Sequence, residues 1–203
     1  MVKNKLRKSL FEQGQSLSDS FITDSNLIIQ SQAMENIDFK SIINNLLYFP
    51  YRYEVSIELI EKEINKYSNN IYMPRIFSNK NMSFNLLDGS PLVKNKYGIN
   101  EINNNKYLDP LSFDCMFIPF VGIDSNGQRL GYGGGYFDRS LEVLNGTKER
   151  PLIVGLGYDY QVSEEVYGEK HDLKYDLVIT ERRVLSFCLK YRMLSILNYD
   201  QIF

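Results

Sequence analysis

The residues best suited to chemistry lie in a glycine-rich segment, Arg129 to Arg139, which reads Arg-Leu-Gly-Tyr-Gly-Gly-Gly-Tyr-Phe-Asp-Arg. Four glycines in five residues free the backbone to adopt positive φ and let a ligand approach the main chain closely. The segment precedes a predicted helix, so successive backbone N–H groups and the positive helix end can bind an anion. Arg129 adds a fork-shaped donor for phosphate oxygens, and Asp138 in the first helical turn can ligate a Mg²⁺ that bridges phosphates.

This segment matches neither of the two common phosphate-binding motifs. A Walker A loop needs a Lys followed by Ser or Thr after its last glycine, and a dinucleotide fingerprint needs a third glycine where Tyr136 stands. The other interpretation is a tight turn with close packing of helix on strand. The flanking Arg129 and Asp138 favour phosphate binding over that interpretation.

Composition predicts one globular domain, residues 1–203, with enough apolar residues for a real core: 43% are hydrophobic. The formal net charge of −2 provides no broad field for nucleic acid or an acidic membrane, so any anion site must be local. Cys115 and Cys188 lack metal-ligand spacing, which favours a reducing compartment. There is no apolar run of membrane-spanning length and no signal-peptide core. We therefore expect a cytoplasmic monomer that binds small molecules, without a nucleic-acid or membrane partner.

Apolar spacing predicts the helices that must position the glycine-rich segment. An amino-terminal helix carries Lys3 and Arg7 on one face, either as ligand-binding cations or as an ordinary solvated face. Ser18 is a plausible N-cap for a second helix. A third amphipathic helix is expected from 57 to 67, and a fourth is marked by Phe137, Leu141 and Leu144.

Apolar runs predict buried strands in the second half of Ile42–Phe49, at Ile71–Pro74, at Cys115–Pro119, at 152–156 and at 177–179. Strands that are apolar on both faces and alternate with helices indicate a mostly parallel sheet. The expected fold is therefore a three-layer α/β architecture with helices on both faces of a central sheet. Residues 183–203 are expected to form a carboxy-terminal helix or packing arm.

Several segments, in order along the chain, resemble the 5-formyltetrahydrofolate cyclo-ligase family. The Arg129–Asp138 segment is similar to the family's R-L-G-x-G-x-G-Y-Y-D signature. The other matching pieces are Lys3-x-x-x-Arg7, Tyr97-Gly98-Ile99-x-Glu101, Asp114 to Pro119, Gln161, and His171-Asp172-x-x-x-Asp176-x-x-x-Thr180-Glu181. One piece alone would be weak, but the ordered set is specific and spans most of the chain.

The resemblance implies an enzyme that uses ATP and Mg²⁺ to cyclise 5-formyltetrahydrofolate to 5,10-methenyltetrahydrofolate, on a fold similar to those of sugar-phosphate isomerases and CoA transferases. It implies an ATP site made of Lys3, Arg7, Arg129, Gly131, Tyr132, Gly133, Gly134, Gly135, Tyr136 and Phe137. It implies folate contacts by Tyr51, Ser56, Tyr132, Gly133, Gly134, Gly135 and Tyr136. It implies Mg²⁺ contacts by Asp138 and Asp172, and catalytic roles for Arg129, Tyr132 and Tyr136.

The chain departs from the family pattern at a few positions. Ser56 stands where relatives often carry an acidic residue thought to engage the pterin. Glu54 is close in sequence, but at an extended strand end it would face the other way. Ile102 replaces a common proline, Tyr167-Gly168 replaces a leucine–proline pair, and Gly134 stands where some members have lysine. Ser56 is the departure that bears on substrate preference.

The implied reaction needs positioning and charge stabilisation more than a strong base. The formamide oxygen on N5 attacks the γ-phosphorus of ATP, N10 attacks the activated carbon, and phosphate leaves. Tyr132 and Tyr136 can stack on the planar rings of the folate. His171, the only histidine, is expected to be structural. Asp138→Ala is expected to abolish turnover at a cost to folding of only about 0.3–1 kcal/mol, as for a surface carboxylate in a first helical turn.

Two other functions remain open. One is a degenerate family member that binds nucleotide or folate without efficient turnover, supported by Ser56 and Tyr167-Gly168. The other is a different enzyme on a related fold, such as a sugar-phosphate isomerase, which would need a carboxylate base and no ATP. A pure binder does not require a complete metal and phosphate site, so the cyclo-ligase is favoured by the set Lys3, Arg7, Arg129, Asp138 and Asp172.

Overall fold

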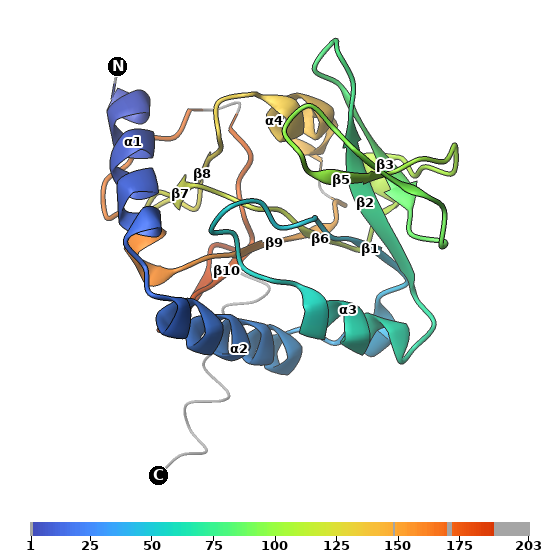
Figure 1. Cartoon of the computed structure of the whole chain (residues 1–203), viewed down its shortest axis with the longest axis horizontal. Helices are drawn as coiled ribbons and strands as arrows, with labels where there is room; N and C mark the ends of the chain where they lie inside the picture. Colours follow the sequence, from blue (N-terminus) through green and yellow to red (C-terminus); the bar gives the residue numbers. More distant parts are fainter. Residues whose placement is uncertain (1, 148, 170–171, 189–203) are drawn as a thin grey trace.

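The computed structural model describes residues 2–147, 149–169 and 172–188. Its centre is a seven-stranded sheet with the order β11-β10-β9-β6-β1-β2-β3 (Figure 1). The five inner strands run parallel, and the two edge strands β3 and β11 are antiparallel to their neighbours. The strands of this sheet are β1 (Asn44–Leu46), β2 (Asn70–Ile76), β3 (Met82–Leu86), β6 (Cys115–Phe117), β9 (Leu152–Leu156), β10 (Leu177–Ile179) and β11 (Val184–Ser186).

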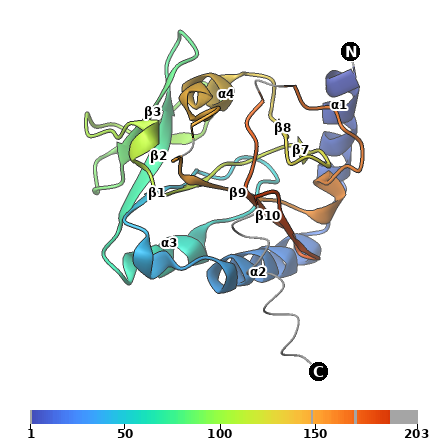
Figure 2. The ribbon, with the colours of Figure 1, turned by 180° about the vertical axis from the view of Figure 1, so that it is seen from behind.

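Helices cover both faces of the sheet, as the sequence predicted. The helices are α1 (Val2–Gln15), α2 (Asp19–Asn36), α3 (Glu58–Asn65) and α4 (Tyr136–Ser140). Helices α2 and α3 lie along one face and α4 lies on the other (Figures 1 and 2). Phe117 joins the core under α2 and α3, whereas its neighbour Met116 joins the core under α4. Burial on both faces explains why β6 reads as a continuous apolar run. None of the described helices combines the length and apolar character needed to cross a bilayer.

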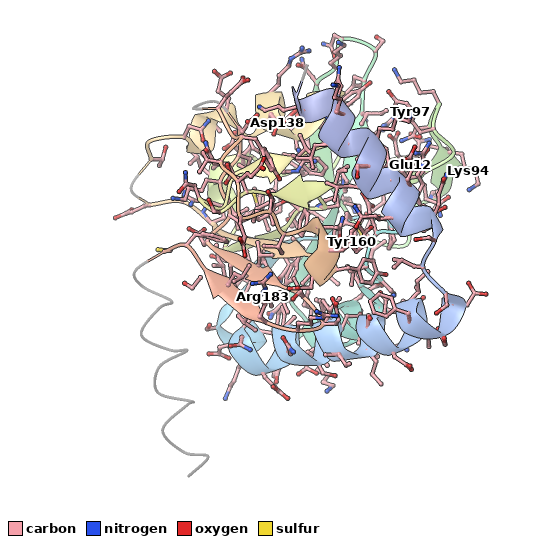
Figure 3. All side chains as sticks on the ribbon, turned by 90° about the vertical axis from the view of Figure 1, so that its left-hand side faces the viewer. Glu12, Lys94, Tyr97, Asp138, Tyr160 and Arg183 are labelled. Carbon is pink, nitrogen blue, oxygen red and sulfur yellow. The ribbon has the colours of Figure 1, made fainter. Side chains whose placement is uncertain are left out.

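Two small ribbons and helix α1 stand outside these layers. The ribbons pair β4 (Leu92–Lys94) with β5 (Asn100–Ile102) and β7 (Gly122–Ile123) with β8 (Arg129–Leu130). Leu10 of α1 packs with Val121 and Leu130 in a separate apolar cluster, so α1 is docked on the β7–β8 ribbon. Figure 3 shows α1 at the front of the molecule and α2 crossing below it. The chain turns between these helices at Ser18, whose hydroxyl accepts from the Phe21 N–H and confirms the predicted N-cap.

The sheet has a topological switch point between β1 and β6. From β1 the chain crosses through α3 to β2 on one side, whereas from β6 it proceeds to β9 and β10 on the other. In open α/β sheets, ligands bind outside the carboxyl ends of the strands at such a point.

The short length of β1 leaves an opening beside β2. On the β2 side, strand β1 pairs with Asn70–Tyr72 alone, and the chain then leaves the sheet towards Pro50. Strand β2 continues to Ile76 along β3, and Pro74 sits in the stretch beyond β1. Because Pro74 has no neighbour on that side, its missing N–H costs no ladder bond. The part of β2 that extends beyond β1, with Pro74 and Ile76, forms part of the wall of the site.

Some sequence expectations were wrong in detail. The first strand is Asn44–Leu46 rather than the second half of 42–49. Tyr67 is exposed and does not belong to the buried face of α3. Residues 184–186 form the edge strand β11 and not a helix, while 189–203 lie outside the described residues.

Candidate active site

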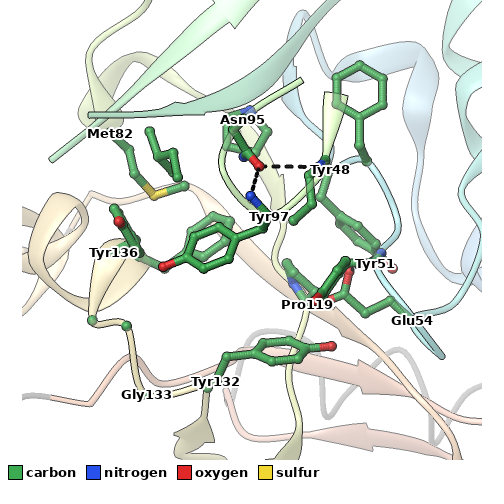
Figure 4. A pocket seen from close by; sticks show the side chains of 18 of the residues that line it. Tyr48, Tyr51, Glu54, Met82, Asn95, Tyr97, Pro119, Tyr132, Gly133 and Tyr136 are labelled. Carbon is green, nitrogen blue, oxygen red and sulfur yellow. Dashed lines mark hydrogen bonds between the residues drawn. The ribbon is translucent and has the colours of Figure 1, made fainter. Parts of the chain in front are cut away.

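A cavity of about 430 Å³ opens at the carboxyl ends of β1, β2 and β6, on the switch point of the sheet. Most of its wall comes from the loop after β1, the end of β2, the β4–β5 ribbon and the glycine-rich segment with the start of α4. Phe11 of α1, Met82 of β3 and Pro119 after β6 complete it. Figure 4 shows aromatic side chains from these segments facing one another across the space. A mostly apolar, concave site with a few converging polar groups is typical of small-molecule binding.

The glycine-rich segment contributes its backbone to the cavity. Gly133 and Gly135 have φ of 93° and 69°, a region that favours glycine. Among the hydrogen bonds of the described residues, none uses the backbone N–H groups of residues 131–135 as donors. Five successive free donors beside a cavity suit an anion with several oxygens. Helix α4 is only five residues long, so the N–H groups, rather than a helix dipole, carry this property.

Arg129 is nearly completely buried and pairs within the protein. Its Nε donates to the Pro119 carbonyl at 2.8 Å, and its Nη1 lies 3.2 Å from Asp138 Oδ1. The guanidinium also lies over the Phe137 ring. Arg129 lines the cavity, but much of its donor capacity holds the start of α4 in place. The pairing also means that Asp138 is not a simple surface carboxylate, so the small folding cost expected for Asp138→Ala is an underestimate.

Helix α1 brings Lys3 and Arg7 to this region from the far end of the sequence. Arg7 Nε donates to the Gly131 carbonyl at 2.7 Å, and its guanidinium lies beside Gly133. Lys3 Nζ lies 2.6 Å from Asp172 Oδ2. Both cations are therefore partly buried and paired within the protein, so they do not form an ordinary solvated face. Neither residue lines the cavity itself. Arg7 flanks its glycine-rich edge, whereas Lys3 pairs with Asp172 and Glu169.

A carboxylate that sequence reasoning set aside lies inside the cavity. Glu54 Oε2 accepts from the Tyr51 N–H at 2.8 Å, and the Tyr132 hydroxyl also hydrogen-bonds this carboxylate. Burial raises the pKa of Glu54 to about 7, although these hydrogen bonds favour the ionised form. Burial and the nearby Glu54 also raise the pKa of Tyr132. The expectation that Glu54 faces away was wrong, because the chain after β1 turns instead of continuing as a strand.

Ser56, in contrast, is not among the residues that line the cavity. Its N–H donates to Asn26 Oδ1, and its hydroxyl accepts from the Glu58 N–H at the start of α3. Tyr51 does line the cavity, with its ring 5.7 Å from the Tyr132 ring. Of the two residues of this loop that were expected to contact folate, only Tyr51 therefore lines the cavity.

The β4–β5 ribbon forms another wall of the cavity, with Asn95, Tyr97, Ile99 and Glu101 among the lining residues. Asn95 Oδ1 accepts from the N–H groups of Tyr97 and Ile99, which shapes the turn (Figure 4). Glu101 is buried and accepts from Asn95 Nδ2 and the Ile76 N–H, so it ties the ribbon to β2. The ring centroid of Tyr97 lies 6.5 Å from that of Tyr136 across the cavity.

The two predicted metal ligands occupy different positions. Asp138 lines the cavity, whereas Asp172 does not and accepts from Lys3 and from the Glu169 N–H. The described residues contain no group of three or more His, Cys, Asp or Glu side chains placed for a metal. Mg²⁺ commonly uses one or two carboxylates together with substrate phosphates, so Asp138 beside the glycine-rich backbone fits such an ion. A metal contact by Asp172 stays a prediction.

Sequence reasoning missed Glu54 and the ribbon residue Asn95. The available signal for Glu54 was a carboxylate directly after the aromatic pair Tyr51 and Tyr53, in the loop that follows a buried strand of a parallel sheet. No comparable local signal marks Asn95, which lies in an Asn- and Lys-rich stretch.

Comparison with known proteins identifies the chain. It belongs to the 5-formyltetrahydrofolate cyclo-ligase family, whose model matches residues 1–181, and it is therefore an enzyme of the ligase class. It is 30% identical to the 5-formyltetrahydrofolate cyclo-ligase of Haemophilus influenzae, with 86% of this chain and 92% of that protein covered. It is 29% identical to the Mycoplasma genitalium enzyme of that name, with 87% of this chain and 96% of the relative covered.

The fold is similar to that of solved members. The 5,10-methenyltetrahydrofolate synthetase of Aquifex aeolicus superposes with a TM-score of 0.78 at 27% identity, covering 92% of this chain and 93% of the other. The Mycoplasma pneumoniae protein with that name superposes with a TM-score of 0.73 at 23% identity, covering 89% and 99%. The expected α/β fold is confirmed.

Proposed function

We propose that this enzyme uses ATP and Mg²⁺ to cyclise 5-formyltetrahydrofolate to 5,10-methenyltetrahydrofolate, releasing ADP and phosphate. The observation that carries the proposal is the pairing, in one cavity, of an unpaired glycine-rich backbone with an aromatic box that contains Glu54. The first suits a triphosphate, and the second suits a flat heterocycle with polar edges. The family membership of the chain supports the same reaction.

The phosphates would be held by residues 131–135, with Arg7 and Lys3 on their outer side. Arg129 is a positioning residue, because it is buried and acts through its ion pair with Asp138. Asp138 would hold a Mg²⁺, which when bound neutralises charge on the phosphates. Phosphoryl transfer asks mainly for such positioning and charge balance.

The folate would lie between Tyr132, Tyr136 and the loop after β1. The amino and imino hydrogens of a 2-amino-4-oxo pterin match the two oxygens of one carboxylate, and Glu54 presents such a carboxylate inside the cavity. Stacking against Tyr132 would orient the formyl oxygen on N5 for attack on the γ-phosphorus. N10 then attacks the activated formyl carbon and loses its proton, and phosphate leaves with the former formyl oxygen.

The alternative of a degenerate binder loses its two supports. Ser56 lies outside the cavity. The N–H groups of Tyr167 and Gly168 donate to the buried Asp124, so this departure from the family pattern serves local structure.

The test follows the near-ultraviolet absorbance of the methenyl product with 5-formyltetrahydrofolate, ATP and Mg²⁺, omitting each in turn. A rise that requires all three is expected, and a rise without ATP contradicts the proposal. Asp138→Asn should lower turnover by about 100-fold or more, because even groups in the outer shell of a metal change activity by about 10–100-fold. Asn keeps an acceptor for Arg129, whereas Asp138→Ala leaves a buried cation without its carboxylate at a cost of about 3–5 kcal/mol. The control is Asp19→Asn, an exposed carboxylate in the first turn of α2.

A further inference from the structure

Arg52 is a cation of the cavity wall that has no carboxylate partner among the described residues. The charged residues that line the cavity are Arg52, Glu54, Glu101, Arg129 and Asp138. Arg129 is paired with Asp138, and Glu101 ties the β4–β5 ribbon to β2. The guanidinium of Arg52 instead lies over two aromatic rings, with its Cζ 5.5 Å from the Phe11 centroid and 5.0 Å from the Tyr51 centroid. A guanidinium stacked in this way keeps its N–H groups, which lie in its plane, available for an anion.

A closed turn sets the direction in which Arg52 leaves the backbone. The Tyr51 N–H donates to the Glu54 carboxylate, and the Glu54 N–H donates back to the Tyr51 carbonyl at 3.1 Å. Arg52 lies inside this turn with a φ of 56°, a left-handed conformation that is unfavourable for a residue with a Cβ. The hydrogen bonds that bring Glu54 into the cavity therefore also hold Arg52 in this conformation at the cavity wall.

Arg52 lies between the two parts of the proposed substrate site. Phe11 follows Arg7 by four residues on α1, so both side chains lie on one face of the helix, about 6 Å apart along its axis. Arg7 flanks Gly133, where the phosphates would lie, and the Phe11 ring beneath Arg52 is 5.4 Å from the ring of Tyr132. The positive charge of Arg52 also acts on the Tyr132 hydroxyl, where it opposes the rise of the pKa caused by burial. The pterin would bind on the other side, at the carboxylate of the same turn.

The group that passes between these two parts is the γ-phosphoryl group. In the proposed reaction the formyl oxygen forms a bond to the γ-phosphorus while the bond from this phosphorus to the β–γ bridging oxygen breaks. The electron pair of that bond leaves with ADP, and no proton moves in this step. The glycine-rich segment offers neutral N–H donors to the phosphoryl oxygens, and Arg129 is held by Asp138. A guanidinium is always charged and can donate to two oxygens at once, so it suits the charge that develops there.

Building on the proposed function, we propose that Arg52 is a further catalytic residue, whose guanidinium donates hydrogen bonds to the γ-phosphoryl group during its transfer to the formyl oxygen. Charge on the bridging oxygen develops only as its bond to phosphorus breaks, so Arg52 stabilises the transition state more than bound ATP. Its loss should therefore lower kcat and leave both KM values nearly unchanged. An arginine that reaches a transferring phosphoryl group raises kcat by about 10³-fold or more.

Arg52→Gly removes the guanidinium without straining the turn, because glycine adopts a φ of 56° freely. The variant should keep the urea midpoint of a folded protein and lose about 10³-fold in kcat. Guanidinium chloride, at concentrations far below those that unfold the protein, should restore part of the lost kcat, whereas sodium chloride at the same concentration should not. Ser68→Gly is the matched control, since Ser68 has a φ of 57° in the turn after α3 and does not line the cavity.

Three kinetic results would overturn the assignment. The first is an unchanged kcat in Arg52→Gly. The second is a raised KM for ATP or for the folate with kcat retained, which would show that Arg52 binds that substrate in its ground state. The third is a loss of kcat that guanidinium does not restore, which would place the effect in the turn and not in the missing side chain.

A binding measurement separates this inference from the proposed function. ADP with aluminium fluoride and Mg²⁺ mimics a transferring phosphoryl group, and isothermal titration follows its binding without turnover, with ADP and Mg²⁺ as the reference. Weaker binding of the aluminium fluoride complex by Arg52→Gly, with ADP binding retained, supports the role of Arg52 even if no methenyl product forms. Equal binding of the complex by wild type and variant refutes that role even if the wild type is an active cyclo-ligase.

Discussion

The raised pKa of Glu54 makes the stability of the protein depend on pH in a direction that can be tested. The ordinary value near 4.5 rises to about 7 in the folded state because the carboxyl group is buried. The folded state therefore holds this proton more tightly than the unfolded state. Its contribution to stability is complete below pH 4.5 and is lost as the pH rises through 7. The difference is about 2.5 pH units, which corresponds to about 3 kcal/mol as an upper value at about 1.36 kcal/mol per unit.

Glu54→Gln removes this dependence with little change of shape. The amide oxygen can still accept from the Tyr51 N–H, and no charge forms at any pH. We expect the variant to match the wild type near pH 5 and to exceed its free energy of unfolding by about 2–3 kcal/mol at pH 8. Folate affinity should fall, because an amide cannot accept both hydrogen bonds of the pterin edge.

The assay is urea unfolding of both proteins at half-unit steps from pH 5 to pH 8, with the difference in free energy plotted against pH. Glu164→Gln, a change at an exposed carboxylate, should give a flat difference. The reasoning is refuted if the Glu54→Gln difference is also flat, or if the variant becomes less stable than the wild type as the pH rises.

Two further predictions concern the glycine-rich segment and its link to α1. Gly133→Ala should cost about 1–2 kcal/mol of folding free energy through its positive φ, because a Cβ there meets Arg7 only at ordinary van der Waals distance and adds no clash. Gly134→Ala acts instead through its Cβ, 2.9 Å from the Tyr136 ring, so it should alter the folate KM more than the urea midpoint. A Gly133→Ala protein as stable as the wild type would contradict the first part. Lys3→Met and Asp172→Asn should show a coupling of about 0.5–1 kcal/mol in a double-mutant cycle of urea unfolding, because their ion pair links α1 to the segment before β10. Additive effects would show that the pair contributes nothing.

Much of the fold followed from local pattern. The strands at 152–156 and 177–179 are buried on both faces, so each is a continuous apolar run that needs no tertiary information to recognise. The cap at Ser18 follows from residue type and position alone. The strand after Ile42 was displaced because an apolar run does not say which of its residues find a partner, and only Asn44–Leu46 lie opposite β2. The edge strand β11 was missed because its pairing with β10 is set by the sheet and not by its own three residues.

The sequence by itself determined the chemistry of the glycine-rich segment, because positive φ and close backbone approach are properties of glycine wherever it stands. It also determined the family, through motifs whose order survives without a structure. Only the tertiary structure decided which residue of the loop after β1 enters the cavity, because a turn there places Glu54 inside and leaves Ser56 outside. Likewise, the approach of Lys96 to Tyr136 joins a ribbon and a helix 40 positions apart. Such contacts depend on sheet order and strand length, which no local pattern encodes.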